Sequence, residues 1–268
     1  MRTGTGNVIP MPTSNDASNT AAVIGEACAV SEEDVTANHI PVAAYKLNSG
    51  LVKVRSELMQ DSGIDISAWL ADRFAERFGR GEESYFTNGT GPSGSPAQPT
   101  GILPAIAASG ATPVTAQGSS ANDGSSATGA NSIGYIDLVN LEHSIDPAYR
   151  RRAKYMLHDN TVGQLKRLVD KYGRPLWAPG ISVGEPDTLY GYPYFVNQGM
   201  PQIGASNTTM IFGDFSKFLV RRVKDMSVKR LVELYAANDE VGFLAFERVD
   251  SALLDAGTHP LNVLQQHS

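Results

Sequence analysis

The sequence contains one cysteine, Cys28, among 268 residues, so no disulfide can form within the chain. It has no uninterrupted apolar run close to the roughly 20 residues that a membrane-spanning helix needs. Its N-terminus carries one arginine and lacks the apolar core of a signal peptide. These absences predict a protein synthesised in the reducing cytoplasm, without a disulfide framework and without a membrane segment.

Basic residues are in deficit, because 22 Lys and Arg face 28 Asp and Glu and the formal net charge is −6. The electric field of such a chain disfavours tight binding to nucleic acid as a primary function. Hydrophobic residues make up 41% of the sequence, which is enough to build the core of one large or two modest domains.

The histidines do not cluster at metal-binding or catalytic spacing. They are His39, His143, His158, His259 and His267. Asp137, His143 and Ser144 have the residue types of a hydrolytic triad, but no G-x-S-x-G elbow presents the serine. We therefore expect no catalytic residue, no metal and no cofactor, and a hydrolase using Asp137, His143 or His158 remains a weaker alternative.

A glycine-rich segment, Gly89–Gly94, formally matches the G-x-G-x-x-G pattern of dinucleotide sites. Such a site needs a helix directly after the glycines, so that the helix N-terminus meets the pyrophosphate. Prolines at 92, 96 and 99 prevent that helix, and no lysine follows in the P-loop arrangement. The segment therefore predicts a loop.

The N-terminal region predicts extended elements that need support. Residues 1–20 hold few large apolar groups and indicate an arm that orders on a partner. Two apolar stretches, Ala21–Ile24 and Ile40–Tyr45, flank acidic Ser31–Asp34 and predict a long hairpin with a charged tip. Because an isolated hairpin is marginally stable in water, this one should pack on its own domain or on a neighbouring subunit.

A strand over Leu51–Arg55 and a following amphipathic helix are the next elements predicted. Asp65 or Ser67 can cap this helix. Its apolar side consists of Ile66, Trp69, Leu70, Phe74 and Phe78. Gly79 and Gly81 resemble a helix stop, although continuation would cost only about 1 kcal/mol per glycine, and the helix should end by Asn88.

The second half mixes helices and strands after a Gly/Ser/Ala-rich loop over residues 88–132. Helices are predicted from Ile136 to about Ser144 and from Asn160 or Thr161 to a stop at Gly173–Pro175. The predicted strands are Tyr192–Val196, Thr208–Phe212, Lys217–Val220, Leu231–Tyr235 and Gly242–Leu254. Because no regular βαβ repeat is present, the pattern favours an α+β fold.

Nine short motifs follow one another along the chain. They are Glu57–Ser62, Asn88–Gly91, Pro99–Ile102, Tyr149–Arg150, Ala153–Leu157, Gly173–Leu176, Leu189–Pro193, Gly213–Phe215 and Glu247–Asp250. With this order and spacing, the sequence resembles the major capsid proteins of tailed bacteriophages, which have the Hong Kong 97-type fold. The resemblance covers nearly the whole chain from about Arg2 onward.

The resemblance implies an extended E-loop hairpin, a P-domain with a long spine helix, and an A-domain. The implied parts are an N-terminal arm segment (1–17), the E-loop hairpin (18–50), a first P-domain part (51–105) with a spine helix over about 63–87, a Gly/Ser/Ala-rich loop (106–129), the A-domain (130–213) and a second P-domain part (214–268). On this basis the helix should run through the two glycines.

The resemblance also implies a structural protein and not an enzyme. Copies of the chain should assemble into hexamers and pentamers of an icosahedral virion shell around double-stranded DNA, after a stage in the host cytoplasm. The implied partners are the chain itself, portal, scaffolding or protease proteins, a decoration protein, and DNA contacted non-specifically. The alternatives are an encapsulin-like compartment or the shell of a gene-transfer particle.

Charge segregation suggests which residues meet between subunits, since an acidic hairpin tip would steer toward basic groups of a neighbour. The contact candidates are Glu26, Glu32, Glu33, Asp34, Arg73, Arg77, Arg80, Arg150, Arg151 and Arg152.

Two features depart from the family pattern, and a third concerns a cross-link that only some relatives form. Relatives usually carry a longer N-terminal arm, often with a scaffolding segment that is removed, so this chain is expected to be a mature or shortened form. Pro92–Gln98 looks like an insertion in a surface loop. Some relatives cross-link an E-loop lysine to an asparagine, but Lys46 is the only hairpin lysine and lies at the base. We therefore predict no such cross-link.

Overall fold

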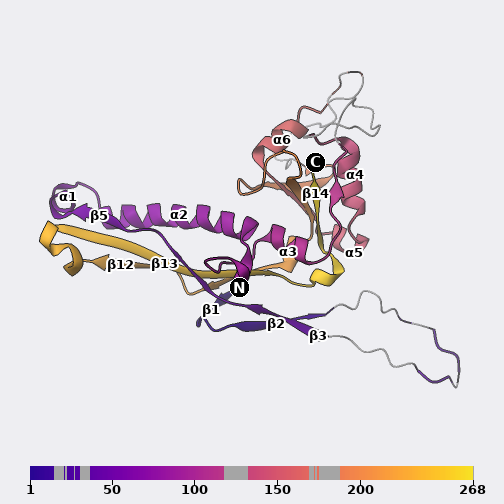
Figure 1. Cartoon of the computed structure of the whole chain (residues 1–268), viewed down its shortest axis with the longest axis horizontal. Helices are drawn as coiled ribbons and strands as arrows, with labels where there is room; N and C mark the ends of the chain where they lie inside the picture. Colours follow the sequence, from indigo (N-terminus) through magenta and orange to yellow (C-terminus); the bar gives the residue numbers. More distant parts are fainter. Residues whose placement is uncertain are drawn as a thin grey trace. The chain divides into compact units, whose positions relative to one another are not determined.

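The computed structural model describes residues 1–14, 21, 23–26, 28–30, 37–117, 132–168, 172, 174 and 188–267. It divides into two compact units. Unit 1 comprises Met1–Pro10, Pro41–Gly101 and Leu219–Ala252. Unit 2 comprises Met11–Ile40, Ile102–Phe218 and Leu253–Ser268. Figure 1 labels several elements of each.

Unit 1 is a mixed sheet with one long helix on it. Strand β13 (Glu240–Leu253) is central and is flanked by β11 (Phe218–Val223) and β12 (Ser227–Leu231). Strands β4 (Tyr45–Asn48) and β5 (Val52–Arg55) also pair antiparallel with β13. At the edge, β1 (Arg2–Thr3) pairs parallel with β11. The sheet therefore joins three separate parts of the sequence.

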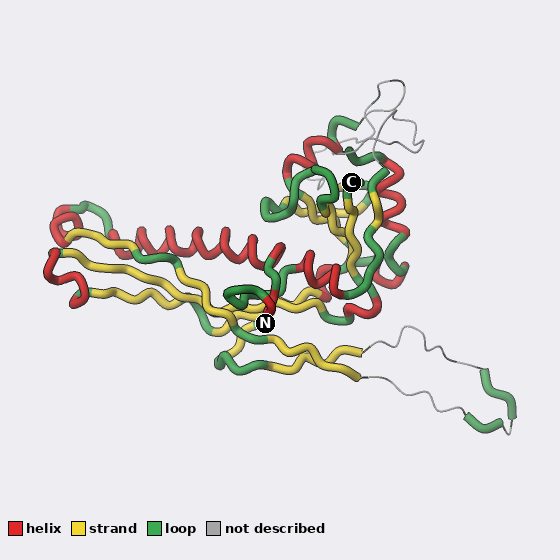
Figure 2. Tube along the Cα trace, in the orientation of Figure 1, coloured by secondary structure: helices red, strands yellow, loops and turns green. Residues whose placement is uncertain are grey.

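Helix α2 spans Ile66–Asn88, after the short helix α1 (Ser56–Asp61), and lies along the strands of unit 1 (Figure 2). The Asp65 carboxylate caps it by accepting from the amides of Ser67 and Ala68. Its buried apolar residues pack against β5 and β13. The cluster consists of Leu70, Phe74, Phe78, Val54, Val241, Phe243 and Ala245.

The helix continues through Gly79 and Gly81, so the glycine stop does not operate. A side chain added at either glycine would meet nothing within 4 Å. Both positions face away from the packed side, and burial of Phe78 offsets the propensity cost of about 1 kcal/mol per glycine.

The chain turns tightly after α2. Thr90 and Thr100 form an isolated antiparallel bridge, which closes the loop containing the 3₁₀ turn η1 (Gly91–Ser93). A Cβ at Gly101 would lie 2.6 Å from the Thr87 carbonyl oxygen, so only glycine fits this approach. Pro92–Gln98 thus lies in a short loop whose ends are joined by the Thr90–Thr100 bridge.

A separate two-stranded sheet pairs β2 (Ile9–Ser14) with β3 (Ala37–Val42). The first hairpin strand was predicted over Ala21–Ile24, and this prediction is wrong. Prolines at 10 and 12 argued against a strand, but in a two-stranded ribbon their missing amides can face solvent. The predicted tip, Ser31–Asp34, lies outside the described residues.

Unit 2 is a six-stranded sheet with helices on both faces. The strand order is β6 (Val114–Thr115), β14 (Leu261–Gln265), β10 (Thr208–Gly213), β7 (Lys154–Leu157), β9 (Tyr192–Val196) and β8 (Thr188–Leu189). Helices α4 (Tyr135–His143) and α6 (Asp159–Leu165) cover one face. Helix α3 (Ile102–Ala108) covers the other.

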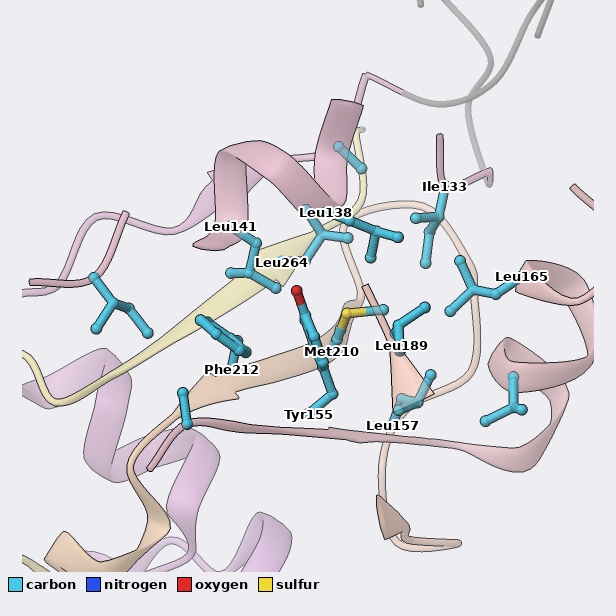
Figure 3. Close-up of a cluster of buried hydrophobic side chains, with 14 residues drawn as sticks. Ile133, Leu138, Leu141, Tyr155, Leu157, Leu165, Leu189, Met210, Phe212 and Leu264 are labelled. Atoms are coloured by element: carbon cyan, nitrogen blue, oxygen red, sulfur yellow. The ribbon is translucent and has the colours of Figure 1, made fainter. Parts of the chain in front are cut away.

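The core under α4 and α6 is built around aromatic rings. The rings of Tyr155 and Phe212 are 4.4 Å apart, and Tyr192 meets the Phe212 ring edge-on at 5.0 Å. Figure 3 shows Leu141, Leu264 and Met210 closing around them. Strand β10 supplies Met210 and Phe212 to this core and Ile211 to the core under α3, so both faces of the sheet are buried.

Several sequence predictions need correction in this half. Helix α3 lies in the predicted loop, and the predicted strand Leu231–Tyr235 ends at Leu231 and gives way to the 3₁₀ helix η3 (Glu233–Asn238). Strands β7 and β14 were not predicted. The remaining short elements are α5 (Pro147–Arg150), η2 (Phe215–Lys217) and η4 (Ala256–Thr258).

The structure also divides the C-terminal region differently from the prediction. One domain was expected over residues 214–268, but Leu253–Ser268 belongs to unit 2. The reason is that β14 pairs antiparallel with β10, and its residues Leu261, Val263 and Leu264 fill both cores of unit 2.

Candidate assembly interface

The exposed side of α2 brings together three of the predicted contact residues. Arg73, Arg77 and Arg80 follow one another at helical spacing, so they share one face. With Trp69 and Val52 they line a groove of about 430 Å³ beside the apolar residues of the helix. We call this the α2 groove.

The three arginines of the α2 groove are only partly neutralised. Arg73 and Arg80 both pair with Glu76, at 3.0 and 3.5 Å. Arg77 instead donates from Nη1 to the Ser49 carbonyl at 3.0 Å. The sequence prediction missed Glu76, although its spacing of three and four residues from the two arginines was the available signal. One carboxylate against three guanidinium groups leaves the rim basic.

An aromatic side chain forms part of the groove wall. Trp69 is 51% exposed, and the Arg73 guanidinium lies 5.9 Å from the centre of its ring. A large, half-exposed aromatic beside arginines has the composition of interface hot spots. The α2 groove therefore has the chemistry to receive an acidic segment that also carries apolar groups.

The second predicted basic cluster, Arg150–Arg152, lies in unit 2. Arg150 ends α5, is half-buried and donates from Nε to the Ile145 carbonyl at 3.0 Å. Arg151 and Arg152 are exposed. Two residues of this cluster are therefore available to a neighbour, while Arg150 stabilises a turn.

Of the acidic candidates, the structure places only one. Glu26 is exposed. Glu32, Glu33 and Asp34 lie outside the described residues, so their pairing stays a prediction.

The base of the hairpin is tied by a buried arginine that sequence reasoning missed. Arg221 is fully buried. Its guanidinium donates to the carbonyls of Thr5, Val42 and Ala43 at 2.7–2.9 Å and to the Thr3 hydroxyl at 3.2 Å. The burial of this arginine could not be predicted from the sequence, because its neighbours in the chain include other charged residues of the kind that usually lie at the surface.

Two carboxyl groups of β13, Asp250 near Arg221 and Glu247 near Arg222, are also buried. Asp250 accepts hydrogen bonds from the amides of Ala43 and Ser251, and burial raises its pKa. Glu247 pairs with Arg222, which also binds Glu82 of α2 at 2.6 Å. Burial, and then the nearby Glu82, raise the pKa of Glu247. These hydrogen bonds and ion pairs hold the segment Val42–Ala43, β11, β13 and α2 together within unit 1.

The residues of the hydrolase alternative have structural roles. Asp137 is fully buried and accepts the amides of Gly134 and Gln117, both at 2.8 Å. His158 caps α6 by accepting the Asn160 amide at 3.0 Å. Ser144 donates to the Leu141 carbonyl, and His143 is exposed on α4. The structure does not arrange these residues as a triad.

The described ranges contain neither a candidate metal cluster nor a candidate membrane span. There, no group of three His, Cys, Asp or Glu side chains could hold a metal ion. No helix in the same ranges combines the length and hydropathy needed to cross a bilayer.

A ribbon hairpin, a long helix on a sheet and a helix-covered sheet together define the Hong Kong 97-type capsid fold, and solved capsids match over the whole chain. The capsid of a native GTA particle matches with a TM-score of 0.77 and 25% identity, covering 100% of this chain and 87% of that one. Microbacterium phage Oxtober96 matches at 0.70 and 18%, covering 99% and 88%. Mycobacterium phage Adephagia matches at 0.68 and 14%, covering 100% and 87%.

The family assignment rests on the sequence as well. The model of the phage capsid family matches residues 1–260, so the chain belongs to that family. No curated protein sequence matches the chain. Together, family and fold make this a structural shell protein that assembles with copies of itself in a capsid.

Proposed function

We propose that the chain is a major capsid protein whose copies form hexamers and pentamers of an icosahedral shell around double-stranded DNA, without catalytic activity of its own. The observation that carries this proposal is the family match over residues 1–260. It is supported by a solved GTA capsid that was computed with C5 symmetry. A head-to-tail contact closes into rings of five or six when its angle adjusts slightly.

Electron microscopy of the purified chain tests this proposal. We expect closed particles of megadalton mass, seen also as a large species by light scattering. A discrete small oligomer that stays small at high protein concentration and under crowding would contradict it.

The parts of the structure take these roles in the proposal. Unit 1 acts as the P-domain with α2 as its spine helix, the helix-covered sheet of unit 2 acts as the A-domain, and β2 and β3 form the base of the E-loop. The chain would be present in the host cytoplasm before assembly. Portal, scaffolding, protease and decoration proteins would be its other partners, and no membrane contact is involved.

The hairpin tip and the α2 groove supply the contact between neighbours in this proposal. The tip carries Glu32, Glu33 and Asp34 in sequence, and the groove has a basic rim with a half-exposed tryptophan. A single exposed ion pair contributes only about 0–1 kcal/mol, so the stabilisation would come from many symmetry-related copies.

A charge swap tests this pairing. Changing Glu32, Glu33 and Asp34 to Lys should lower shell yield by about tenfold or more, since like charges would then oppose one another. Adding Arg73→Glu and Arg80→Glu should restore shells. These two positions are chosen because Arg77 also holds the Ser49 carbonyl. If Arg151→Glu with Arg152→Glu restores shells instead, the hairpin tip contacts the unit 2 cluster and does not contact the α2 groove.

A second candidate is the shell of a gene-transfer particle, because the GTA capsids match at 25% identity, compared with 14–18% for the phages named above. Sequencing the DNA inside purified particles separates the two. Random host fragments would identify a gene-transfer shell, and a single phage genome would identify a virion. A protein cargo without DNA would identify an encapsulin-like compartment.

A further inference from the structure

The two faces of the unit 1 sheet differ in charge. Along β13, Phe243 and Ala245 face α2, so the alternate residues Phe246 and Arg248 face the opposite way. On β4, Lys46 is the register partner of Arg248, and on β12, Lys229 is the partner of Leu244. Three cations from three strands therefore share the face that looks away from α2.

These cations surround a hollow of about 380 Å³, which we call the basic pocket. Lys224, from the turn after β11, also lines it. Phe246 lies in its wall, with the Lys46 Nζ 3.8 Å and the Lys229 Nζ 5.8 Å from the centre of its ring. The ring therefore gathers two ammonium groups that would otherwise repel one another.

The acids that border the basic pocket are already paired with other arginines. Asp225 lies 3.1 Å from Arg2, and Glu247 pairs with Arg222. Among the described residues, Lys46, Lys224, Lys229 and Arg248 form no ion pair. Four cations without carboxylate partners thus sit together in a chain whose net charge is −6.

Lys224 holds a backbone conformation that glycine adopts more easily. Its φ is 57°, in the left-handed region that costs a side-chain-bearing residue roughly 1–2 kcal/mol. Its amide donates to the Thr3 carbonyl at 3.0 Å, which needs the turn but not the ammonium group. The turn therefore gives no structural reason for a lysine, and the lysine adds a charge to the pocket.

We infer that the basic pocket binds phosphate groups of a nucleic-acid backbone, so that this face of the sheet contacts the DNA inside the shell. Lysines bind phosphate as flexible point charges, and an arginine adds a planar fork. Such contacts position a backbone without reading its bases. The inference rests on the proposed DNA-containing shell and adds where the chain meets its contents.

The salt dependence of oligonucleotide binding tests the inference. Full-length chain, kept unassembled as checked by light scattering, is titrated against a fluorescent DNA duplex by anisotropy between 50 and 200 mM salt. Each phosphate contact contributes about 0.9 to the slope of log K against log salt. Lys46→Gln, Lys229→Gln and Arg248→Gln together should lower the slope by about 2–3 and affinity at 50 mM salt by at least about tenfold.

The matched control removes the same charge elsewhere, with Arg55→Gln, Arg167→Gln and Arg230→Gln. Arg230 is the sequence neighbour of Lys229 but points to the other face of the sheet. The control should keep the wild-type slope. Lys224→Gly should lower affinity while leaving the unfolding midpoint unchanged or higher, which a merely structural lysine would not do.

Three results would overturn the inference: an unchanged slope in the basic-pocket variant, an equal loss in the control, or a basic-pocket variant that cannot form shells yet binds the duplex normally. The last result would make this face a contact between copies. Shell formation by the wild type, seen by electron microscopy, reports separately on the proposed function. Shells with an unchanged slope would reject the basic pocket alone.

Discussion

The two units bury their sheets differently. In unit 2, helices cover both faces, and β10 contributes to two cores from alternate residues. In unit 1, α2 covers one face. The opposite face is covered in part, by Tyr235 and Leu51 at Gly242 and by the segment around Ala43 at Asp250. Unit 2 therefore completes its own core, whereas unit 1 leaves the α2 groove and the basic pocket open on its surface.

Unit 1 compensates for its smaller apolar core with buried polar ties, and the largest expected effect comes from cutting one. Arg221→Met would remove the donor from three carbonyls, of which that of Val42 is buried, and would leave Asp250 without its nearby cation. We expect a loss of about 3–5 kcal/mol in the free energy of unfolding, measured by urea denaturation with circular dichroism. Arg230→Met, at an exposed strand position, should change it by less than about 0.5 kcal/mol.

Truncation of one aromatic in each unit sharpens the comparison. Phe212→Ala removes a fully buried ring from unit 2 and should cost about 3–5 kcal/mol of unfolding free energy. Trp69→Ala removes a half-exposed ring from the α2 groove and should cost less than about 1 kcal/mol, because little buried area is lost.

Trp69→Ala has the smaller expected effect on stability, but it should have the larger effect on assembly. Loss of a hot-spot aromatic costs about 2 kcal/mol or more, so Trp69→Ala should raise the concentration needed for shells by more than about tenfold. Light scattering against protein concentration measures this. If Trp69→Ala unfolds the chain as Phe212→Ala does, the tryptophan belongs to the core and the contrast between the units fails.

The glycines of α2 should show a smaller effect of opposite sign. Gly79→Ala and Gly81→Ala add methyl groups in open space within a helix, so each should stabilise unit 1 by about 0.5–1 kcal/mol. Gly101→Ala is the matched change where the backbone approaches closely, and it should destabilise the chain. Thermal and urea midpoints of the three variants provide the measurement.

The smallest effect concerns pH. Burial raises the pKa of Asp250 and Glu247 above their ordinary values of 3.8 and 4.5. The folded chain then holds protons that the unfolded chain has released, so this contribution to stability is lost as pH rises through the raised pKa values. Asp250→Asn with Glu247→Gln should therefore gain stability relative to the wild type between pH 4 and pH 7. A difference that does not change with pH would contradict the assignment.

Local patterns in the sequence predicted the regular elements well and the non-local ones poorly. The cap at Asp65 and the apolar spacing up to Phe78 predicted α2, and α+β was confirmed as the class. Strand β14 was missed because its partner β10 is some fifty residues away and because the polar residues Asn262 and Gln265 interrupt its short apolar pattern. Helix α3 was missed because alanine and glycine suggested a loop, while tertiary packing of Ile102 and Ile106 decides the helix.

Arg73, Arg77 and Arg80 were predicted as contact residues from charge segregation. The structure places them along one groove, and their contact with a neighbour stays a prediction. The basic pocket could not be predicted, because its residues come from three strands and the turn after β11, and only the register of the sheet brings them together. Arg221 was missed for the same reason.

The contacts of Arg221 also set the order in which the molecule is completed during translation. The donor and its acceptors at Thr3 and Thr5 are separated by 218 and 216 positions. At about 5–20 residues per second, the ribosome needs roughly 10–45 s to make that length. The nascent chain therefore lacks these hydrogen bonds for most of its synthesis. They can form at the base of the hairpin only when nearly the whole polypeptide has emerged.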